Sequence, residues 1–246
     1  MSEFQVGYIF IALIVSAFIK GSLGLGFSTI CLAMLVHVID LKTAISIVLM
    51  PSLLSNAMVM VDAGQFRHSL SQFWLMLAMA IPGMALGLQV LRSADNTVSL
   101  MILSGVLVVY GVWGYRNRAF RLPAEWRSKL NPFVGLSTGM VNGATGSQIF
   151  PIMPYLLSLP IEKEVLVQTI NMSFTLCSLV MLAALYAYGY LDLVSGATFS
   201  LSVFPVALGV WLGNRARKRL NDDLYRRLAM LLMVVLGVLL LVRKLV

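Results

Sequence analysis

The chain has 246 residues and a net charge of +8; 59% of its residues are hydrophobic and only 11% are charged. Soluble domains carry about 25% charged residues, so this composition excludes a water-soluble fold and predicts an all-α integral membrane protein with the lipid bilayer as a partner. The basic residues stand at the ends of apolar segments, which favours membrane topology over nucleic-acid binding.

Eight apolar segments follow one another along the chain, with polar joints between them. They cover residues 5–36, 43–63, 72–93, 96–115, 132–158, 163–189, 192–212 and 224–242. A membrane-spanning helix needs about 20 apolar residues, so most of these segments predict one span each. The first segment has no basic n-region and no cleavage site, and we expect it to be a retained span.

Two of the segments are interrupted, and the first of them, 5–36, is also too long for one ordinary span. Segment 5–36, the first broken segment, contains the glycine-rich run 21–26. Segment 132–158, the second broken segment, contains the run 143–146, followed by two prolines. Glycine and proline punctuate helices, so each broken segment predicts two helical pieces joined by a break.

Landmarks in the first half of the chain recur in the second half at a nearly constant spacing. Gly21 precedes Gly143 by 122 positions, and Pro82 precedes Pro205 by 123, which is half of 246. The same order of features at one spacing predicts an internal duplication. We expect a first membrane repeat at 1–118, a basic cytoplasmic linker at 119–131 and a second membrane repeat at 132–246.

The distribution of basic residues indicates how the broken segments thread. If each crosses the membrane, the basic joints 116–131 and 213–227 fall on opposite sides. If each returns to its own side, thirteen lysines and arginines fall on one face and four on the other. The positive-inside rule favours the second threading, with both termini outside. It predicts two inverted-topology repeats, each a broken re-entrant-type helical hairpin plus three transmembrane helices.

The paired breaks are the predicted binding site for substrate. An unpaired backbone amide in hydrocarbon costs several kcal/mol, so irregular backbone there usually lines a cavity. Helix N-termini expected near Phe27 and Ile149 would attract an anion, and the two breaks should face one shared cavity. The alternative is close helix packing through small residues. The expected substrate-binding residues are Lys20, Gly21, Ser22, Gly24, Gly26, Asn56, Asn142, Gly143, Thr145, Gly146, Ser147, Gln148 and Asn171.

Lys20 carries the only charge that falls well inside an apolar segment next to a break. A bare ammonium is costly there, so we expect it to face a cavity or a partner, with snorkelling to an interface as the alternative. Asn56 and Asn171 stand in the middles of later segments. Each could contact substrate or form an interhelical hydrogen bond.

The sequence offers no pattern typical of an enzyme or a metal site. We find no Asp or Glu buried within an apolar segment, and no metal-binding or nucleotide-binding motif. Cys31 and Cys177 are interpreted as packing residues. We therefore expect no enzyme activity, no catalytic residue, no metal and no cofactor.

Two stretches resemble the sulfite exporter TauE/SafE family of membrane transporters. Residues 139–175, with a glycine-rich turn, a proline pair and a polar helix, resemble the family's second-half segment. Residues 18–27 resemble its first-half turn but lack the usual glycine triplet and the following proline. The resemblance implies transport of sulfite, organosulfonates or related sulfur oxyanions without a nucleotide-hydrolysing domain.

We therefore predict a secondary transporter of small anions in the bacterial cytoplasmic membrane, working by alternating access between the inverted repeats. The alternatives are a carrier of a neutral or cationic metabolite and a non-transporting membrane assembly subunit. The direction of transport, the coupling ion and a homodimeric state stay open.

Overall fold

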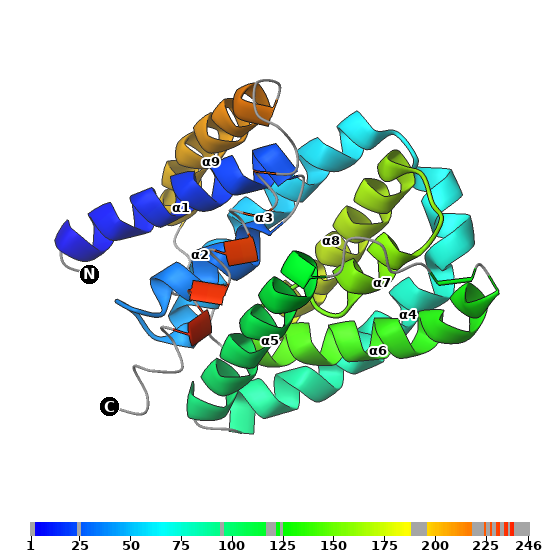
Figure 1. Cartoon of the computed structure of the whole chain (residues 1–246). Helices are drawn as coiled ribbons and strands as arrows, with labels where there is room; N and C mark the ends of the chain where they lie inside the picture. The colour runs from blue at the N-terminus through cyan, green and yellow to red at the C-terminus, as the bar shows by residue number, and fades with distance from the viewer. Residues whose placement is uncertain are drawn as a thin grey trace.

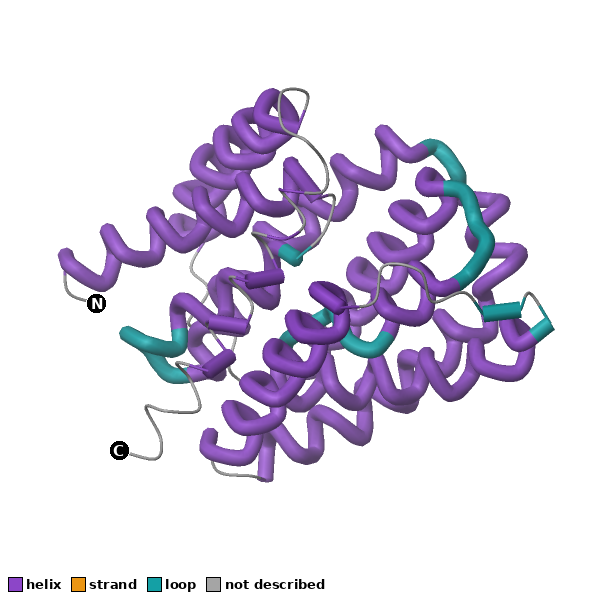
Figure 2. The backbone as a smooth tube through the Cα atoms, viewed as in Figure 1, coloured by secondary structure: helices purple, strands orange, loops and turns teal. Residues whose placement is uncertain are grey.

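The computed structural model is a bundle of helices, with no strand among the residues it describes (Figures 1 and 2). It describes residues 3–23, 26–93, 96–116, 122–123, 125–187 and 196–217, and further along the chain residues 224, 227, 230, 231, 234, 235, 237 and 238. The helices of the first half are α1 (Glu3–Leu23), α2 (Phe27–Leu35), α3 (Leu41–Ala63), α4 (Phe66–Ser93) and α5 (Asn96–Arg116). Those of the second half are α6 (Trp126–Thr145), α7 (Ile152–Ser158), α8 (Lys163–Ala187) and α9 (Gly196–Arg217).

The helices confirm an all-α membrane protein. Five of those described, α1, α3, α4, α5 and α8, contain stretches long and apolar enough to cross a membrane. Large apolar side chains such as Phe4, Val61, Phe133 and Phe204 point outward, each at least 70% exposed. Outward apolar side chains on apolar helices are suited to contact with lipid. The chain is therefore a multi-pass membrane protein.

Each broken segment contains a helix, a break and a short helix, as predicted. Gly26, with a φ of 94°, precedes α2, and Gly146, with a φ of 71°, ends α6. Left-handed backbone of this kind favours glycine, which explains that residue at both breaks. The breaks are shorter at their N-terminal ends than expected, because Gly21 and Gly143 still lie within helices. The second short helix begins at Ile152 rather than near Ile149.

Both broken segments turn back on themselves. In the first, Gln5 Nε2 donates a hydrogen bond of 3.1 Å to the carbonyl oxygen of Val38, beyond the end of α2. In the second, the Leu122 amide donates a hydrogen bond of 2.7 Å to the carbonyl oxygen of Ser158, the last residue of α7. Each short helix thus ends beside the start of the long helix before it.

Glycines bring α4 and α6 into close parallel contact. A Cβ atom added to Gly139 would lie 2.1 Å from the carbonyl oxygen of Ala80, so only glycine permits this approach. Gly135 faces Met76, and further along both helices Gly143 faces residues 84–88. Residue numbers rise in the same direction along both helices at these contacts, so α4 and α6 are parallel.

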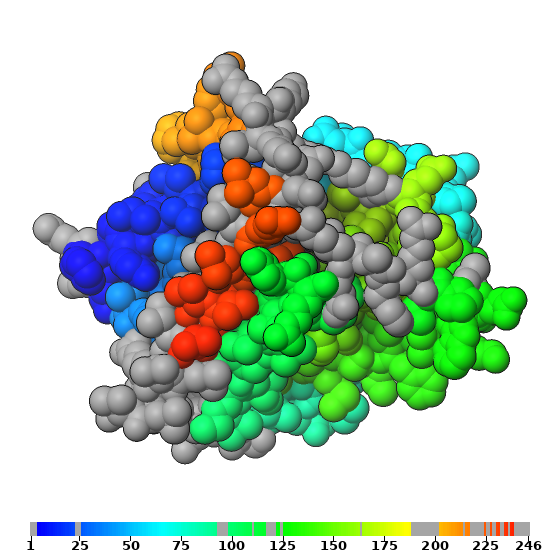
Figure 3. All heavy atoms as spheres, in the orientation of Figure 1, coloured from blue at the N-terminus to red at the C-terminus, as the bar shows by residue number. Residues whose placement is uncertain are grey.

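The helices α1 and α9 form a second parallel pair of the same kind. A Cβ atom on Gly213 would lie 2.2 Å from the carbonyl oxygen of Phe18, and one on Gly209 would lie 2.6 Å from that of Ile14. Figure 3 shows α1 in blue and α9 in orange as adjoining parts of one face. The first helix of each half therefore packs against the fourth helix of the other half.

The helices α3 and α8 pack against each other in the centre, in opposite directions. Leu49 of α3 and Met181 of α8 line one pocket. Further along α3, the Gln65 amide just beyond the helix donates a hydrogen bond of 3.2 Å to Gln168 Oε1, nearer the start of α8. Residue numbers rise along one helix as they fall along the other, so the pair is antiparallel.

The expected linker at 119–131 overlaps the start of α6. Helix α6 begins at Trp126, so residues 126–131 are helical, and residues 117–121 and 124 lie outside the described part of the chain.

Further along, the described residues at 230–237 pack on α5, where Gly111 faces Met230 and Val234.

Candidate functional site

Lys20 is buried near the C-terminal end of α1, with a side chain that is only 1% exposed. Its Nζ donates hydrogen bonds to Asn56 Oδ1 on α3 and, over 3.2 Å, to Asn171 Oδ1 on α8. Asn171 Nδ2 in turn donates to the carbonyl oxygen of Val167 over 2.8 Å, which leaves the Asn171 oxygen for Lys20. The lysine therefore faces partners from both halves rather than snorkelling to an interface.

The two breaks meet beside Lys20. Thr29 Oγ1 and Ser147 Oγ share a hydrogen bond of 2.9 Å, and Ser28 Oγ donates to Gln148 Oε1 over 3.4 Å. The Ser147 amide donates to Thr145 Oγ1 over 3.1 Å, which ties the residues of the second break together. The prediction that the breaks face one another is thereby confirmed for the described residues.

A narrow pocket lies at this meeting point; it is too tight to hold a water molecule as the helices now stand, and we call it the Lys20 pocket. Both halves of the chain line it, and it includes the first turn of α2. Its lining residues are Lys20, Gly26, Phe27, Ser28, Thr29, Gln148, Ile149 and Phe174. The first backbone hydrogen bond of α2 runs from the Ile30 amide to the Gly26 carbonyl oxygen, so the amides of residues 27–29 precede the helical ladder.

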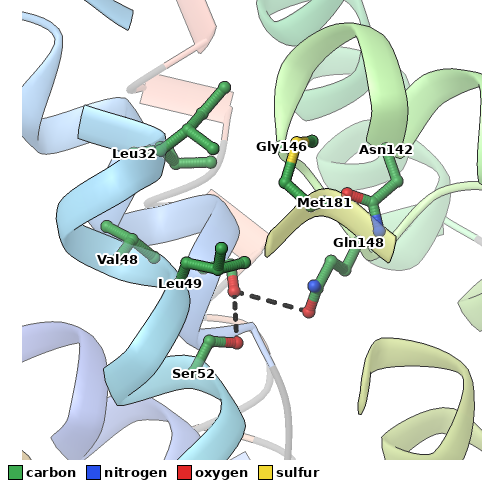
Figure 4. A pocket seen from close by; sticks show the side chains of 10 residues that line it. Leu32, Val48, Leu49, Ser52, Asn142, Gly146, Gln148 and Met181 are labelled. Carbon is green, nitrogen blue, oxygen red and sulfur yellow. Dashed lines mark hydrogen bonds between the residues drawn. The ribbon is translucent and has the colours of Figure 1, made fainter. Parts of the chain in front are cut away.

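A second pocket adjoins the first and shares Ser28 and Gln148 with it; we call it the Met181 pocket (Figure 4). Ser28 Oγ also shares a hydrogen bond of 2.8 Å with Ser52 Oγ on α3, drawn as a dashed line in Figure 4. The lining combines apolar side chains with serine, asparagine and glutamine side chains. Its residues are Ser28, Leu32, Ile45, Val48, Leu49, Ser52, Asn142, Gly146, Gln148 and Met181.

Two buried amide groups near the pockets have nitrogen atoms without a hydrogen-bond partner. Asn56 Nδ2 belongs to the same amide group whose oxygen contacts Lys20. Asn142 Nδ2 is the other unpaired nitrogen; this residue lines the Met181 pocket, and the weakly polar Cys177 thiol is the nearest group that its amide could contact. An unpaired buried donor costs about 1–3 kcal/mol, so both groups are suited to an incoming acceptor.

The structure gathers most of the expected site residues at the two pockets. Five of these residues line the pockets: Lys20, Gly26, Asn142, Gly146 and Gln148. Two more, Asn56 and Asn171, accept hydrogen bonds from Lys20. Thr145 and Ser147 lie at the second break and are joined by a hydrogen bond.

Three other expected site residues are engaged in contacts between helices. Gly21 faces Val210 of α9, Gly143 faces α4, and Ser22 Oγ donates to the carbonyl oxygen of Gly213 over 3.0 Å. These contacts correspond to the small-residue packing that the sequence left open as the alternative. Gly24, which was also expected at the site, lies outside the described residues.

Sequence reasoning missed several polar residues that the structure places at the pockets. Ser28 and Thr29 follow the first break directly, and their hydroxyl groups bind the second break. Ser52 on α3 and Ser178 on α8 extend this network, since Gln148 Nε2 donates to Ser178 Oγ over 2.7 Å. The sequence did contain a signal for Ser28 and Thr29, because hydroxyl residues that directly follow a break lie in the first turn of the next helix and therefore near the break.

The lining of both pockets contains no carboxylate, and the described residues contain no cluster of three His, Cys, Asp or Glu side chains. The site therefore consists of one lysine, neutral amide and hydroxyl groups, a helix N-terminus and an apolar wall. Such groups suit binding of an anion through charge and hydrogen bonds.

Comparison with known proteins identifies the chain. No solved structure and no curated protein sequence matches it. The family model described as Sulfite exporter TauE/SafE matches residues 8–240, nearly the whole length, including both breaks and every helix around the Lys20 pocket. The chain therefore belongs to the sulfite exporter TauE/SafE family of membrane transporters.

Proposed function

We propose that this protein is a secondary transporter of small anions, most of all sulfite, organosulfonates or related sulfur oxyanions. One observation carries the proposal: a buried lysine with only neutral hydrogen-bond partners lies where the two broken segments meet. An ionisable side chain in hydrocarbon is costly and marks a substrate pathway by default. An anion in the Lys20 pocket would pair with the charged form of this lysine.

The surroundings of Lys20 supply further groups that an oxyanion can use. The N-terminus of α2 presents backbone amides and the positive end of the helix dipole at residues 27–29. Asn56 Nδ2 is a free donor beside the lysine. A tetrahedral or pyramidal oxyanion has several acceptor oxygens and could bind these donors together with Lys20.

Transport by alternating access between two inverted repeats is part of this proposal. Both broken segments turn back on themselves, α3 and α8 are antiparallel, α1 pairs with α9, and α6 pairs with α4. These relations support halves of opposite orientation, because a membrane-crossing second segment would make α3 and α8 parallel. We place the protein in the bacterial cytoplasmic membrane with both termini outside.

Flux into proteoliposomes containing the purified full chain tests the proposal. Radiolabelled sulfite, thiosulfate and methanesulfonate should enter faster than into empty liposomes, whereas acetate and choline should not. Lys20→Met should reduce the anion flux at least tenfold, and the matched variant Lys129→Met, at an exposed position at the start of α6, should not. Choline entry without anion entry would replace the proposal with a cation carrier.

A further inference from the structure

Lys20 is the one titratable side chain in the lining of the two pockets. Resting on the proposed function, we infer that Lys20 takes up a proton when the anion binds, so that the protein moves one anion together with one proton. The inference comes from the hydrogen-bond partners of Nζ, from the absence of a nearby carboxylate, and from the burial of the site.

The partners of Lys20 match the donors of a neutral amine. A neutral amine has two N–H donors and one lone pair, whereas an ammonium group has three N–H donors and needs three acceptors. The structure gives Nζ two acceptors, Asn56 Oδ1 and Asn171 Oδ1. An ammonium group would therefore keep a third N–H for another acceptor, and an anion in the Lys20 pocket would provide it.

Among the side chains that the structure describes, the helices around Lys20 provide no opposite charge at its level. Asp62, the carboxylate of α3, lies six residues beyond Asn56, about 9 Å along the helix, and is exposed. Glu164 stands in the first turn of α8, seven residues before Asn171. The other titratable described side chains on α1, α2, α3, α8 and α9 are Tyr8, Cys31, Lys42, Cys177, Tyr186 and Arg215, and none of them lines the Lys20 pocket.

Burial then links the charge of Lys20 to occupation of the pocket. Without an anion, an ammonium group at Lys20 would lack both hydration and a compensating charge, because the side chain is buried. An anion favours the ammonium group, so a proton from water joins the Nζ lone pair and the new N–H donates to the anion. This coupling is reciprocal: the factor by which a bound anion strengthens proton binding at Lys20 is also the factor by which the proton strengthens anion binding. When a monovalent anion and a proton bind together, the net charge of the site does not change.

Proton movement in proteoliposomes tests the inference with methanesulfonate and thiosulfate, two anions that stay fully ionised between about pH 6 and 9. A pH dye inside the vesicles should report acidification as methanesulfonate enters, with one proton per anion. A pH difference of one unit, acid outside, should drive accumulation of methanesulfonate about tenfold, because one pH unit corresponds to a tenfold ratio. A membrane potential imposed with potassium and valinomycin should not alter the methanesulfonate flux.

Lys20→Arg separates charge from proton exchange, because the guanidinium group does not release its proton in proteins. This variant should still be stabilised thermally by methanesulfonate, but anion addition in weak buffer should no longer cause proton uptake. Anion entry without protons in the wild-type protein would overturn the inference and leave the proposed function standing. Entry of neither anion would overturn both. If Lys20→Arg fails to fold, the wild-type proton count decides alone.

Discussion

Lys20 and Asn171 are separated by 151 positions in the chain, and Lys20 Nζ lies 3.2 Å from Asn171 Oδ1 at the centre of the bundle. Asn56, on the other side of the lysine, comes from the first half of the chain. One lysine is thus held by one amide from each half, so a relative movement of the halves would change the environment of the lysine directly.

Asn171→Leu should weaken anion binding without preventing insertion. The substitution removes one of the two acceptors that hold Lys20 in position, so the lysine is less well placed for the anion; the unpaired buried donor also costs about 1–3 kcal/mol of folding free energy. The concentration dependence of thiosulfate flux should show a raised KM at an equal amount of folded protein. An unchanged KM would mean that Asn171 only joins helices and does not support the binding site.

A cross-link between Thr29 and Ser147 should stop transport reversibly. Their hydroxyl oxygens are 2.9 Å apart, so Thr29→Cys with Ser147→Cys brings two thiols together in a background where Cys31 and Cys177 are replaced by Ala. Oxidation should abolish thiosulfate flux and a reducing agent should restore it, because alternating access requires the breaks to separate. Full flux in the oxidised, cross-linked protein would exclude that movement. Each single cysteine variant is the control.

Bulk at the second break should harm transport more than loss of a hydroxyl group. At Gly146, where φ is 71°, a Cβ atom would lie 2.8 Å from Ile45 Cγ1 and 2.9 Å from Leu32 Cδ1. Gly146→Leu should therefore abolish anion flux, whereas Ser147→Ala should reduce it only a few-fold. Gly105→Leu is the matched control, since nothing lies within 4 Å of a Cβ atom there. Equal flux in the Gly146→Leu and Gly105→Leu variants would contradict this prediction.

Gly139→Ala should destabilise the folded protein. Its Cβ atom would lie 2.1 Å from the Ala80 carbonyl oxygen, so α4 and α6 must move apart, at a cost of about 1–3 kcal/mol. Thermal unfolding in detergent should show a lower Tm than for the wild type. Gly105→Ala should leave the Tm nearly unchanged. Similar Tm values for the two variants would mean that the contact between α4 and α6 contributes little to stability.

The proposed orientation predicts the location of both termini. A reporter active only in the cytoplasm should give no signal when fused after Val246, because this end is placed outside. The same reporter fused after Arg116, at the end of α5, should give a strong signal. The reversed result would refute the orientation, and a signal from both fusions would refute the odd number of crossings in the second half.

Sequence patterns located the breaks because glycine and proline act locally. The left-handed backbone at Gly26 and Gly146 follows from residue type, and the spacing of the two breaks indicated that they belong together. The charge pattern similarly favoured hairpins that return to their own side. The contacts of Gln5 with Val38 and of Leu122 with Ser158 agree with that interpretation.

The roles of individual glycines could not be predicted in the same way. Gly21 and Gly26 stand in the same short run, yet the first faces Val210 of α9 and the second lines the Lys20 pocket. The difference depends on a helix nearly 190 positions away, which no local pattern records. The partners of Lys20 were beyond sequence reasoning for the same reason, because Asn56 and Asn171 are brought to it by tertiary packing.

The exchange of helices between the halves has a consequence for synthesis. Helix α1 leaves the ribosome first, but its glycine-lined partner α9 follows only after α2–α8 have been made. Until then Lys20 also lacks Asn171, so the first half must wait in the bilayer with a polar group and a packing surface uncovered. The two halves are interlocked, and neither can reach its final packing alone. Fragments 1–118 and 119–246 should therefore be degraded when made separately and persist when made together.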